Sequence, residues 1–451
     1  MRREIKSVQS NNPSKSVIQT KYPAYKDSGE YWMGNIPDHW ELKKLKHVFH
    51  EKKKVTNQSL NAGSISFGKV VYKDDEKIPE STKASYQELL AGEYLVNPLN
   101  LNYDLISLRI GLSDKNVVVS SGYIILKNSI KIDKVYYNYL LHRYDVAYMK
   151  LLGSGVRQTI SYNHIANSLL AIPPISEQTA IARFLDEKTA KIDQAIAQKQ
   201  QLIALLKERR QIMIQELVTG KKVWNGTIWA APEKTKDSGI PWIGEIPEGW
   251  EVTRLKFISE VQTGLTLGKI YRSKLASIAY LRVANVQDGY FDLEEIATVE
   301  IPYSDISKYL LKKGDILVTE GGDIDKLGRG SLWESEIDPC IHQNHVFAIR
   351  ISAEKTFAEY VTVLMGANYS RRYFIDTATK TTNLASTNST KLGNLPIVLP
   401  TYVEQENIFE FIQEESSKID QSISLQEQQI EKLREYKATM IDSAVTGKIK
   451  V

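Results

Sequence analysis

Two blocks of this sequence occur twice, in the same order, so the chain contains two copies of one structural frame. The block KDSGEYWMGNIPDHWELKKLK begins at Lys26 and returns from Lys236 as KDSGIPWIGEIPEGWEVTRLK, with 12 of 21 positions identical. A second block of 45 residues begins at Glu177 and again at Glu404, with 20 positions identical. The offsets are 236 − 26 = 210 and 404 − 177 = 227, so the second copy holds 227 − 210 = 17 more residues between its blocks. Most of the sequence between the blocks does not match, which indicates two like frames that carry two different inserts.

Composition is that of an ordinary soluble protein with room for two or three domains in 451 residues. The single cysteine, Cys340, excludes an internal disulfide framework and favours a reducing cytoplasm. No apolar run approaches the ~20 residues of a membrane helix. Residues 1–20 are interpreted as a flexible polar tail, because no hydrophobic stretch follows their basic residues as it would in a secretory signal. The net charge of +4 is compatible with nucleic-acid binding without requiring it.

The repeated 45-residue blocks are predicted to form long helices. Each lacks proline and glycine until a closing Thr-Gly pair, at Gly220 and Gly447, which suits a helix C-terminus. Apolar side chains recur in steps of three, four and seven residues, as in the seam of a coiled coil. These positions are Leu185, Ile192, Ile196, Ile203, Leu206, Met213 and Leu217 in the first helix and Ile412, Ile419, Ile423, Ile430, Leu433, Met440 and Ala444 in the second. The shared seam favours pairing of the helices with each other, and the alternative is that each packs on its own domain.

The path of the chain favours an antiparallel pair. A helix of ~42 residues spans roughly 60 Å, and a parallel arrangement would require residues 222–403 to return along that whole length. Antiparallel helices allow this insert to close as a compact domain, with the insert at 26–174 at the opposite end of the rod. The expected fold class is therefore α+β, with two mixed α/β domains, an antiparallel coiled coil between them and an internal pseudo-two-fold axis. Such an axis suits duplex DNA, whose strands are related by two-fold axes, and a rigid spacer would fix the distance between two half-sites.

The inserts show signals of both strands and helices. β-rich runs punctuated by glycine and asparagine predict strands, and tyrosine-rich stretches that follow them predict helices. The predicted strands are Lys69–Tyr72, Asn116–Leu126, Ile316–Thr319 and Val346–Ile351, and the predicted helices are Val135–Leu151 and Thr356–Phe374.

The sequence resembles a specificity subunit of a type I DNA restriction–modification system. The resemblance is carried by the opening KYPAYKDSGEYWMGNIPDHWELKKLK from Lys21, by its second copy from Lys236, and by helices that begin Glu-Gln and end Val-Thr-Gly-Lys. Both helices also contain Lys-Ile-Asp, at Lys191–Asp193 and Lys418–Asp420. It implies two target-recognition domains, each reading half of a bipartite asymmetric site in double-stranded DNA. The implied division is a tail at 1–20, domain 1 at 21–174, a spacer helix at 175–221, a linker at 222–235, domain 2 at 236–401, and a second spacer helix with a C-terminal tail at 402–451.

The resemblance also implies partners and cofactors. The helices would act as a ruler and as docking surfaces for two copies of an N6-adenine methyltransferase subunit, and restriction subunits would add ATP-driven translocation and cleavage. No cofactor is expected on this chain, and S-adenosylmethionine, ATP and magnesium are expected on the partners.

A search for catalytic motifs favours a non-catalytic subunit. The nearest match to the (D/N)PP(Y/F/W) motif of amino-methyltransferases is Asn97-Pro98-Leu99, which does not qualify, and no phosphate-binding G-x-x-x-x-G-K-(S/T) loop is present. Cys340, His342 and His345 lie close in sequence, but on a strand His345 would point away from the other two, so no metal site is predicted. The alternatives are a self-contained methyltransferase or nuclease with an unrecognised motif, or a coiled-coil scaffold with no nucleic-acid role.

Candidate DNA contacts lie in corresponding loops of the two inserts. In the first, the loop GSGVRQTISY offers basic, amide and hydroxyl side chains for base edges and phosphates. The region offset by 227 is again rich in hydroxyl groups but has no arginine at the equivalent position. The candidates are Arg157, Gln158, Ser161 and Tyr162 in the first insert and Lys380, Thr381, Asn383, Arg329, Gln343 and Asn344 in the second.

Overall fold

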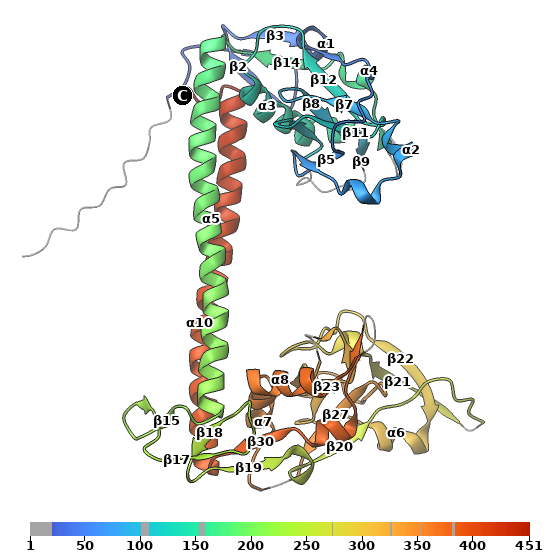
Figure 1. The fold of residues 1–451 in the computed structure, drawn as a ribbon, viewed down its shortest axis with the longest axis vertical. Helices are drawn as coiled ribbons and strands as arrows, with labels where there is room; N and C mark the ends of the chain where they lie inside the picture. The colour runs from blue at the N-terminus through green and yellow to red at the C-terminus, as the bar shows by residue number, and fades with distance from the viewer. Residues whose placement is uncertain are drawn as a thin grey trace, which may run out of the picture. The chain divides into compact units, whose positions relative to one another are not determined.

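The computed structural model describes residues 20–100, 108–152, 158–272, 274–324, 327–352, 354–380 and 384–451 (Figure 1). The chain divides into two compact units, each assembled from separate parts of the sequence. Unit 1 comprises residues up to 199 together with 428–451, and unit 2 comprises residues 200–427. The expected tail at 1–20 lies outside the described residues except for Thr20. No helix within the described ranges is both long and apolar enough to cross a membrane.

A four-stranded antiparallel sheet forms the centre of unit 1, in the order β10–β8–β12–β4. Its strands are short and largely buried, and the tyrosine-rich helix α3 packs on them with Tyr136, Tyr137 and Tyr144 in the same hydrophobic core. The β1–β2 hairpin and the β3–β14 pair complete the frame. The bounds are β1 Tyr25–Asp27, β2 Asn35–Pro37, β3 Glu41–Lys44, α1 Leu45–Val48, β4 Phe49–Glu51, β8 Tyr94–Val96, β10 Ile110–Leu112, β12 Ile124–Asn128, α3 Lys134–Ala147 and β14 Leu169–Ile172.

Unit 2 repeats this frame with the same strand order. Its central sheet runs β25–β23–β27–β20, all antiparallel, and strand by strand it corresponds to β10–β8–β12–β4. The β17–β18 hairpin and the β19–β30 pair match those of unit 1 in register. The bounds are β17 Thr235–Asp237, β18 Glu245–Pro247, β19 Glu251–Arg254, β20 Ser259–Thr263, β23 Ile316–Thr319, β25 Gly330–Leu332, β27 Val346–Ile351, α7 Ala358–Met365, α8 Asn368–Thr377 and β30 Pro396–Leu399. The prediction of two mixed α/β domains is confirmed.

The units differ in what is added to this frame. Unit 1 adds β5 Gly63–Ser66, β6 Lys69–Tyr72, η1 Asp75–Lys77, α2 Glu80–Lys83, β7 Gln87–Leu89, β9 Leu99–Asn100, β11 Val117–Val119, η2 Met149–Leu151, β13 Gln158–Thr159 and α4 Tyr162–Ile165. Unit 2 adds β15 Val223–Trp224, β16 Trp229–Ala230, η3 Leu255–Phe257, β21 Leu275–Leu281, η4 Val283–Asn285, β22 Ala297–Pro302, α6 Tyr303–Tyr309, β24 Gly321–Gly322, β26 Cys340–His342, β28 Thr379–Lys380, β29 Ala385–Ser386 and α9 Ser389–Gly393. In unit 2, β22–β21–β26 form a second sheet with hydrophobic clusters of its own.

The repeated blocks form the helices α5 (Ile175–Val218) and α10 (Tyr402–Val445). Within each unit an ion pair joins segments of the two helices: Lys437 binds Asp193 at 2.6 Å in unit 1, and Arg210 binds Asp420 at 2.6 Å in unit 2. The seam residues named above are buried or half-buried along both helices. Apolar contact on one side and charged side chains on the other is the arrangement expected of an amphipathic helix pair.

The Glu-Gln pair at each helix start fixes the helix to the domain before it. Gln178 accepts a hydrogen bond from the Asp133 amide at 2.9 Å and donates one to the Pro173 carbonyl at 2.8 Å. Gln405 accepts from the Thr356 hydroxyl at 2.7 Å and donates to the Pro400 carbonyl at 3.0 Å. Repetition of this motif in the sequence therefore has a structural cause.

Several predicted elements are interrupted. Asn116–Leu126 contains two strands, β11 and β12, because a turn at 120–123 closes with Tyr123 donating its amide hydrogen to Ser120 at 3.0 Å. The helix predicted to Leu151 ends at Ala147 and is followed by η2. Thr356–Phe374 contains α7 and α8, separated where Ala367 adopts extended backbone.

The segment at 222–235, expected to be a linker, contains the β15–β16 hairpin. Its Trp229 lies 5.0 Å from Phe411 of α10, measured between ring centroids, so the segment packs on the helix.

Candidate nucleic-acid interface

The candidate residues of unit 2 meet at one end of its central sheet. The Thr319 amide donates to the Arg329 carbonyl at 3.2 Å, and the Glu320 amide donates to the His345 carbonyl at 2.9 Å. Thr387 donates its amide hydrogen to the Glu320 carbonyl at 2.8 Å. The end of β23 and the residue after it thus join three segments that are far apart in the sequence: those of Arg329, of Gln343–Asn344, and of Thr387, which follows the partner strand of Lys380.

Unit 1 uses the corresponding end of its sheet in the same way. The Asn97 amide donates to the Arg109 carbonyl at 2.8 Å, and the Ile160 amide donates to the Pro98 carbonyl at 3.1 Å. β9 pairs with β13 here, as β24 pairs with β29 in unit 2. The described ends of the two loops, Gln158–Thr159 and Ala385–Ser386, are related by the offset of 227 and occupy equivalent places.

Ser161 and Tyr162 line a cleft of about 240 Å³ together with Lys54, Ser121 and Asn163. Tyr162 donates its hydroxyl hydrogen to the Phe49 carbonyl at 2.8 Å, and burial raises its pKa. The hydroxyl is therefore protonated but has no second hydrogen to donate to a phosphate. Ser161 is the N-cap residue of α4. Its amide donates a hydrogen bond to Nδ1 of His164 at 2.9 Å.

Two of the candidates in unit 2 already have partners within the protein. The Gln343 side-chain oxygen accepts from the Val283 amide at 3.3 Å, and the Asn344 side chain lies 3.3 Å from the His345 ring. Lys380, in β28, is exposed to solvent. The backbone of Gln158 lies in β13. Arg157, Thr381 and Asn383 lie outside the described residues.

Arg109 and Arg329 hold the same place in the two sheets but have different surroundings. Arg109 is buried and its Nε lies 2.9 Å from Asp145 of α3, whose pKa is raised by burial in spite of the guanidinium beside it. Arg329 is half-buried, and its buried Nε has no hydrogen-bond acceptor among the described residues. Nη2 of Arg109 also lacks an acceptor among these residues, so the two arginines differ in the carboxylate beside Arg109 and in the greater exposure of Arg329. A half-exposed guanidinium can bind an anion such as a phosphate.

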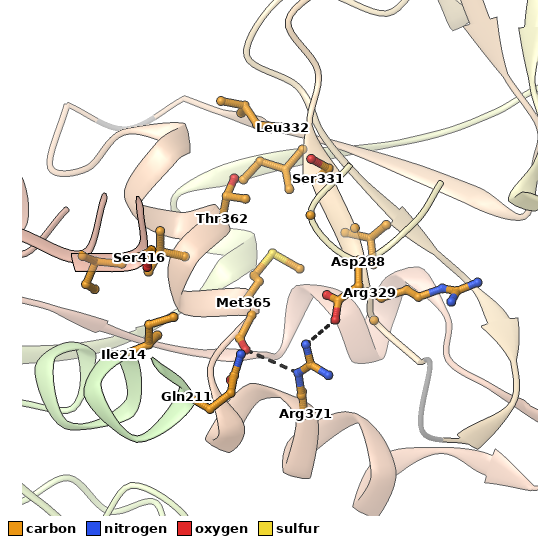
Figure 2. Close-up of a pocket in the computed structure, with 18 of the residues that line it drawn as sticks. Gln211, Ile214, Asp288, Arg329, Ser331, Leu332, Thr362, Met365, Arg371 and Ser416 are labelled. Carbon is orange, nitrogen blue, oxygen red and sulfur yellow. Dashed lines mark hydrogen bonds and ion pairs between the residues drawn. The ribbon is translucent and has the colours of Figure 1, made fainter. Parts of the chain in front are cut away.

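Arg329 also lines a cavity of about 640 Å³ that lies wholly within unit 2 (Figure 2). Arg210 of α5 and Arg371 of α8 contribute two further guanidinium groups to its lining. Figure 2 shows Arg371 directed toward Asp288, which it binds at 2.5 Å, while the side chain of Arg329 leads away from that pair. Arg371 is paired with Asp288 and Arg210 with Asp420, so Arg329 supplies the remaining positive charge of the lining.

The burial and partners of Cys340, His342 and His345 favour structural roles for these side chains. Cys340 and His342 are buried in β26, where burial raises the pKa of Cys340 to about 12 and lowers that of His342. His345 is exposed and its Nδ1 lies 2.5 Å from Glu320. In the part of the chain that the structure describes, no group of three or more histidine, cysteine, aspartate or glutamate side chains could hold a metal ion.

Known proteins match both copies of the frame. A family model described as the type I restriction modification DNA specificity domain matches residues 37–205 and again residues 247–435. This chain belongs to that family. The prediction of a type I restriction–modification specificity subunit, with DNA sequence specificity as its role, is therefore confirmed.

Curated relatives and a solved structure agree with this assignment. The putative type I restriction enzyme MjaX specificity subunit of Methanocaldococcus jannaschii is 32% identical over 206 residues, and the alignment spans only 45% of this chain and 47% of the relative. The MjaVIII specificity subunit of the same organism is 24% identical, covering 92% of this chain and 94% of its own. A chain solved in a study of complex assembly and conformational transition of the type I R-M system has the same fold, with a TM-score of 0.62 at 14% identity and coverage of 91% and 98%.

Residues whose role depends on contacts between distant parts of the chain were not predicted from the sequence. Asp288 and Arg371 form an ion pair although 83 residues separate them, and the segment at 319–322 carries no distinctive side chains. Arg109 gave no signal because its correspondence to Arg329 follows from strand pairing and not from sequence offset.

Proposed function

We propose that each unit reads one half of a bipartite, asymmetric site in double-stranded DNA. One observation carries this proposal: the two units share one sheet topology, yet different loops meet at the same end of each sheet. The shared sheet fixes the position of each recognition domain, and the loops at its end determine which base edges are contacted. Because the loops differ, the two half-sites should differ.

We further propose that α5 and α10 form an antiparallel coiled coil that sets the gap between the half-sites, with an approximate two-fold axis across it. The ion pairs between the two helices inside each unit and the buried seam support this arrangement. The same helices would dock two methyltransferase subunits, and restriction subunits would join the complex. S-adenosylmethionine, ATP and magnesium would be bound by those partners, in the cytoplasm.

The proposed test is a single-molecule map of N6-methyladenine in a methylation-free host that expresses the neighbouring methyltransferase gene with or without this chain. A split motif with a fixed gap, present only with the chain, is the expected result. A continuous motif, or the same methylation without the chain, would overturn the proposal.

Purification separates this function from that of a self-contained enzyme. The chain alone should methylate and cleave no DNA, whereas the chain mixed with its methyltransferase subunit should modify the mapped site. Methylation by the chain alone would contradict the subunit assignment.

A further inference from the structure

In each unit, a tight turn that the frame does not require is anchored to the same edge strand. In unit 1 the β5–β6 turn is held by Gly68, whose amide donates to the Leu108 carbonyl at 3.2 Å, two residues before β10. In unit 2 a turn at 287–290 is held by Gly289, whose amide donates to the carbonyl of Gly330, the first residue of β25, at 3.1 Å. Since β10 and β25 correspond, two unrelated sequences, SFGK and QDGY, are anchored to the same edge strand, two positions apart.

Both turns expose an aromatic ring next to the anchoring glycine. Phe67 is 71% exposed and Tyr290 is 61% exposed. Neither ring stabilises the core, and an exposed phenyl ring gains nothing from water. Their common feature is presentation of an apolar face at the surface.

The backbone at Phe67 shows that this presentation has a conformational cost. Phe67 has φ of +46° and Gly68 has φ of +74°, a two-residue turn in which Asn-Gly is the usual sequence. An aromatic residue with positive φ is an outlier, and such outliers gather at functional sites. The turn itself would form more easily with asparagine or glycine, so the ring requires another explanation.

Each turn is also anchored at the end of the sheet where the candidate DNA contacts meet. The anchoring carbonyl in unit 1 belongs to Leu108, directly before Arg109, and the one in unit 2 to Gly330, directly after Arg329. Exposed Lys69 follows the first turn, and Arg371 binds Asp288 within the second. Proteins bind DNA phosphates with basic side chains and insert apolar side chains between base steps. A basic side chain beside an exposed ring is therefore a combination suited to duplex DNA.

We propose that Phe67 and Tyr290 are matched DNA contacts, one for each half-site, whose rings press into a groove of duplex DNA and set how readily the local base step deforms. This inference rests on the proposed reading of a split site and assigns one further residue to each reader. Specificity would then come partly from the energy of deforming the half-site and not only from hydrogen bonds to base edges.

The test uses the chain assembled with its methyltransferase subunit and a fluorescent duplex that carries the mapped site. Phe67→Ala and Tyr290→Ala should each weaken binding by about tenfold. On duplexes with single base changes, each variant should lose discrimination in one half-site only, and the two variants should affect different halves. The matched controls Tyr31→Ala and Phe257→Ala remove rings that are 102% and 70% exposed elsewhere in the same units, and should leave binding unchanged.

Phe67→Gly separates a DNA contact from a folding defect. Glycine accepts the positive φ, so the Tm of this variant should equal or exceed that of the unaltered chain, while its DNA affinity should fall as far as that of Phe67→Ala. Unchanged affinity and discrimination in both alanine variants would overturn the inference, as would an equal loss in the controls. Lost methylation with intact DNA binding would also overturn it, because the rings would then contact a partner subunit. A complex with the unaltered chain that reads no split site would instead overturn the proposed function.

Discussion

At the scale of single residues, the repeated Thr-Gly pair shows how one position can serve two requirements. Gly220 has φ of +69°, and a Cβ atom there would overlap Pro247 Cδ. Gly447 has φ of +73°, and its Cβ would overlap Pro37 Cδ. In each case the end of a helix meets the hairpin of the repeated opening block, within one unit. Chirality and space together exclude any other residue.

Gly220→Ala should therefore destabilise unit 2 by roughly 2–4 kcal/mol, the sum of left-handed strain and overpacking. Gly226→Ala is the matched control, because Gly226 has φ of +92° but nothing lies within 4 Å of the position that its Cβ would take. It should cost only about 1–2 kcal/mol. Thermal unfolding of both variants measures the difference, and equal losses would show that the proline contact contributes nothing.

Removal of the two equivalent arginines should have different effects: loss of Arg109 should lower stability, and loss of Arg329 should weaken DNA binding. Arg109→Ala leaves Asp145 buried without its partner and should cost about 3–5 kcal/mol of unfolding free energy. Arg329→Ala should change stability by no more than about 0.5 kcal/mol. If Arg329 binds a phosphate, its loss should reduce the salt dependence of DNA binding by about one counterion. Urea unfolding and salt-titrated binding of both variants test this contrast, and an unaltered salt slope for Arg329→Ala would remove it from the interface.

At the scale of elements, the start of α5 depends on a single carboxylate. Glu177 accepts hydrogen bonds from the Tyr22 hydroxyl at 2.9 Å and the Trp40 indole at 3.0 Å, and it lies 2.7 Å from the His39 ring. Burial acts to raise the pKa of Glu177, but the donors Trp40, His39 and Tyr22 together lower it. The repeated block at 26–46 and the repeated helix are thus joined through one ionised group.

Glu177→Gln should destabilise unit 1 by about 1–3 kcal/mol near pH 7, because the charged acceptor is lost while the shape is kept. The folded chain binds a proton on Glu177 less readily than the unfolded chain, so this contribution is complete above pH 4.5 and is lost as the pH falls through the lowered pKa. Unfolding of the two proteins between pH 7 and pH 3 should show a difference that shrinks with acid. A constant difference would assign the effect to packing.

At the scale of the whole molecule, the proposed ruler predicts how the target gap responds to helix length. Four residues inserted into both α5 and α10, near 199 and 428, add about 6 Å to an antiparallel pair, close to two base-pair steps of about 3.4 Å. The mapped motif should keep both half-site sequences and widen its gap. Altered half-site letters with an unchanged gap would refute the ruler.

Much of the frame could be predicted from the sequence because its signals are local. The strands at Lys69–Tyr72, Ile316–Thr319 and Val346–Ile351 have the predicted bounds, since each is a short β-rich run. Interruptions such as the turn at 120–123 and the break at Ala367 were missed because tertiary packing decides where a marginal element ends. The candidate loops were placed by their offset of 227, whereas the partners of Gln343 and Tyr162 could not be foreseen.

The sequence alone determined that this chain is a duplication, that its repeated blocks include two long helices, and to which family it belongs. Those conclusions rest on repeats and on helical periodicity, which are properties of neighbours along the chain. Only the tertiary structure decided that the dissimilar inserts share one sheet order, that Arg109 corresponds to Arg329, and that the turns of Phe67 and Tyr290 are anchored to corresponding edge strands. The reason is physical: strand pairing depends on backbone hydrogen bonds and a buried face, which many different sequences can supply.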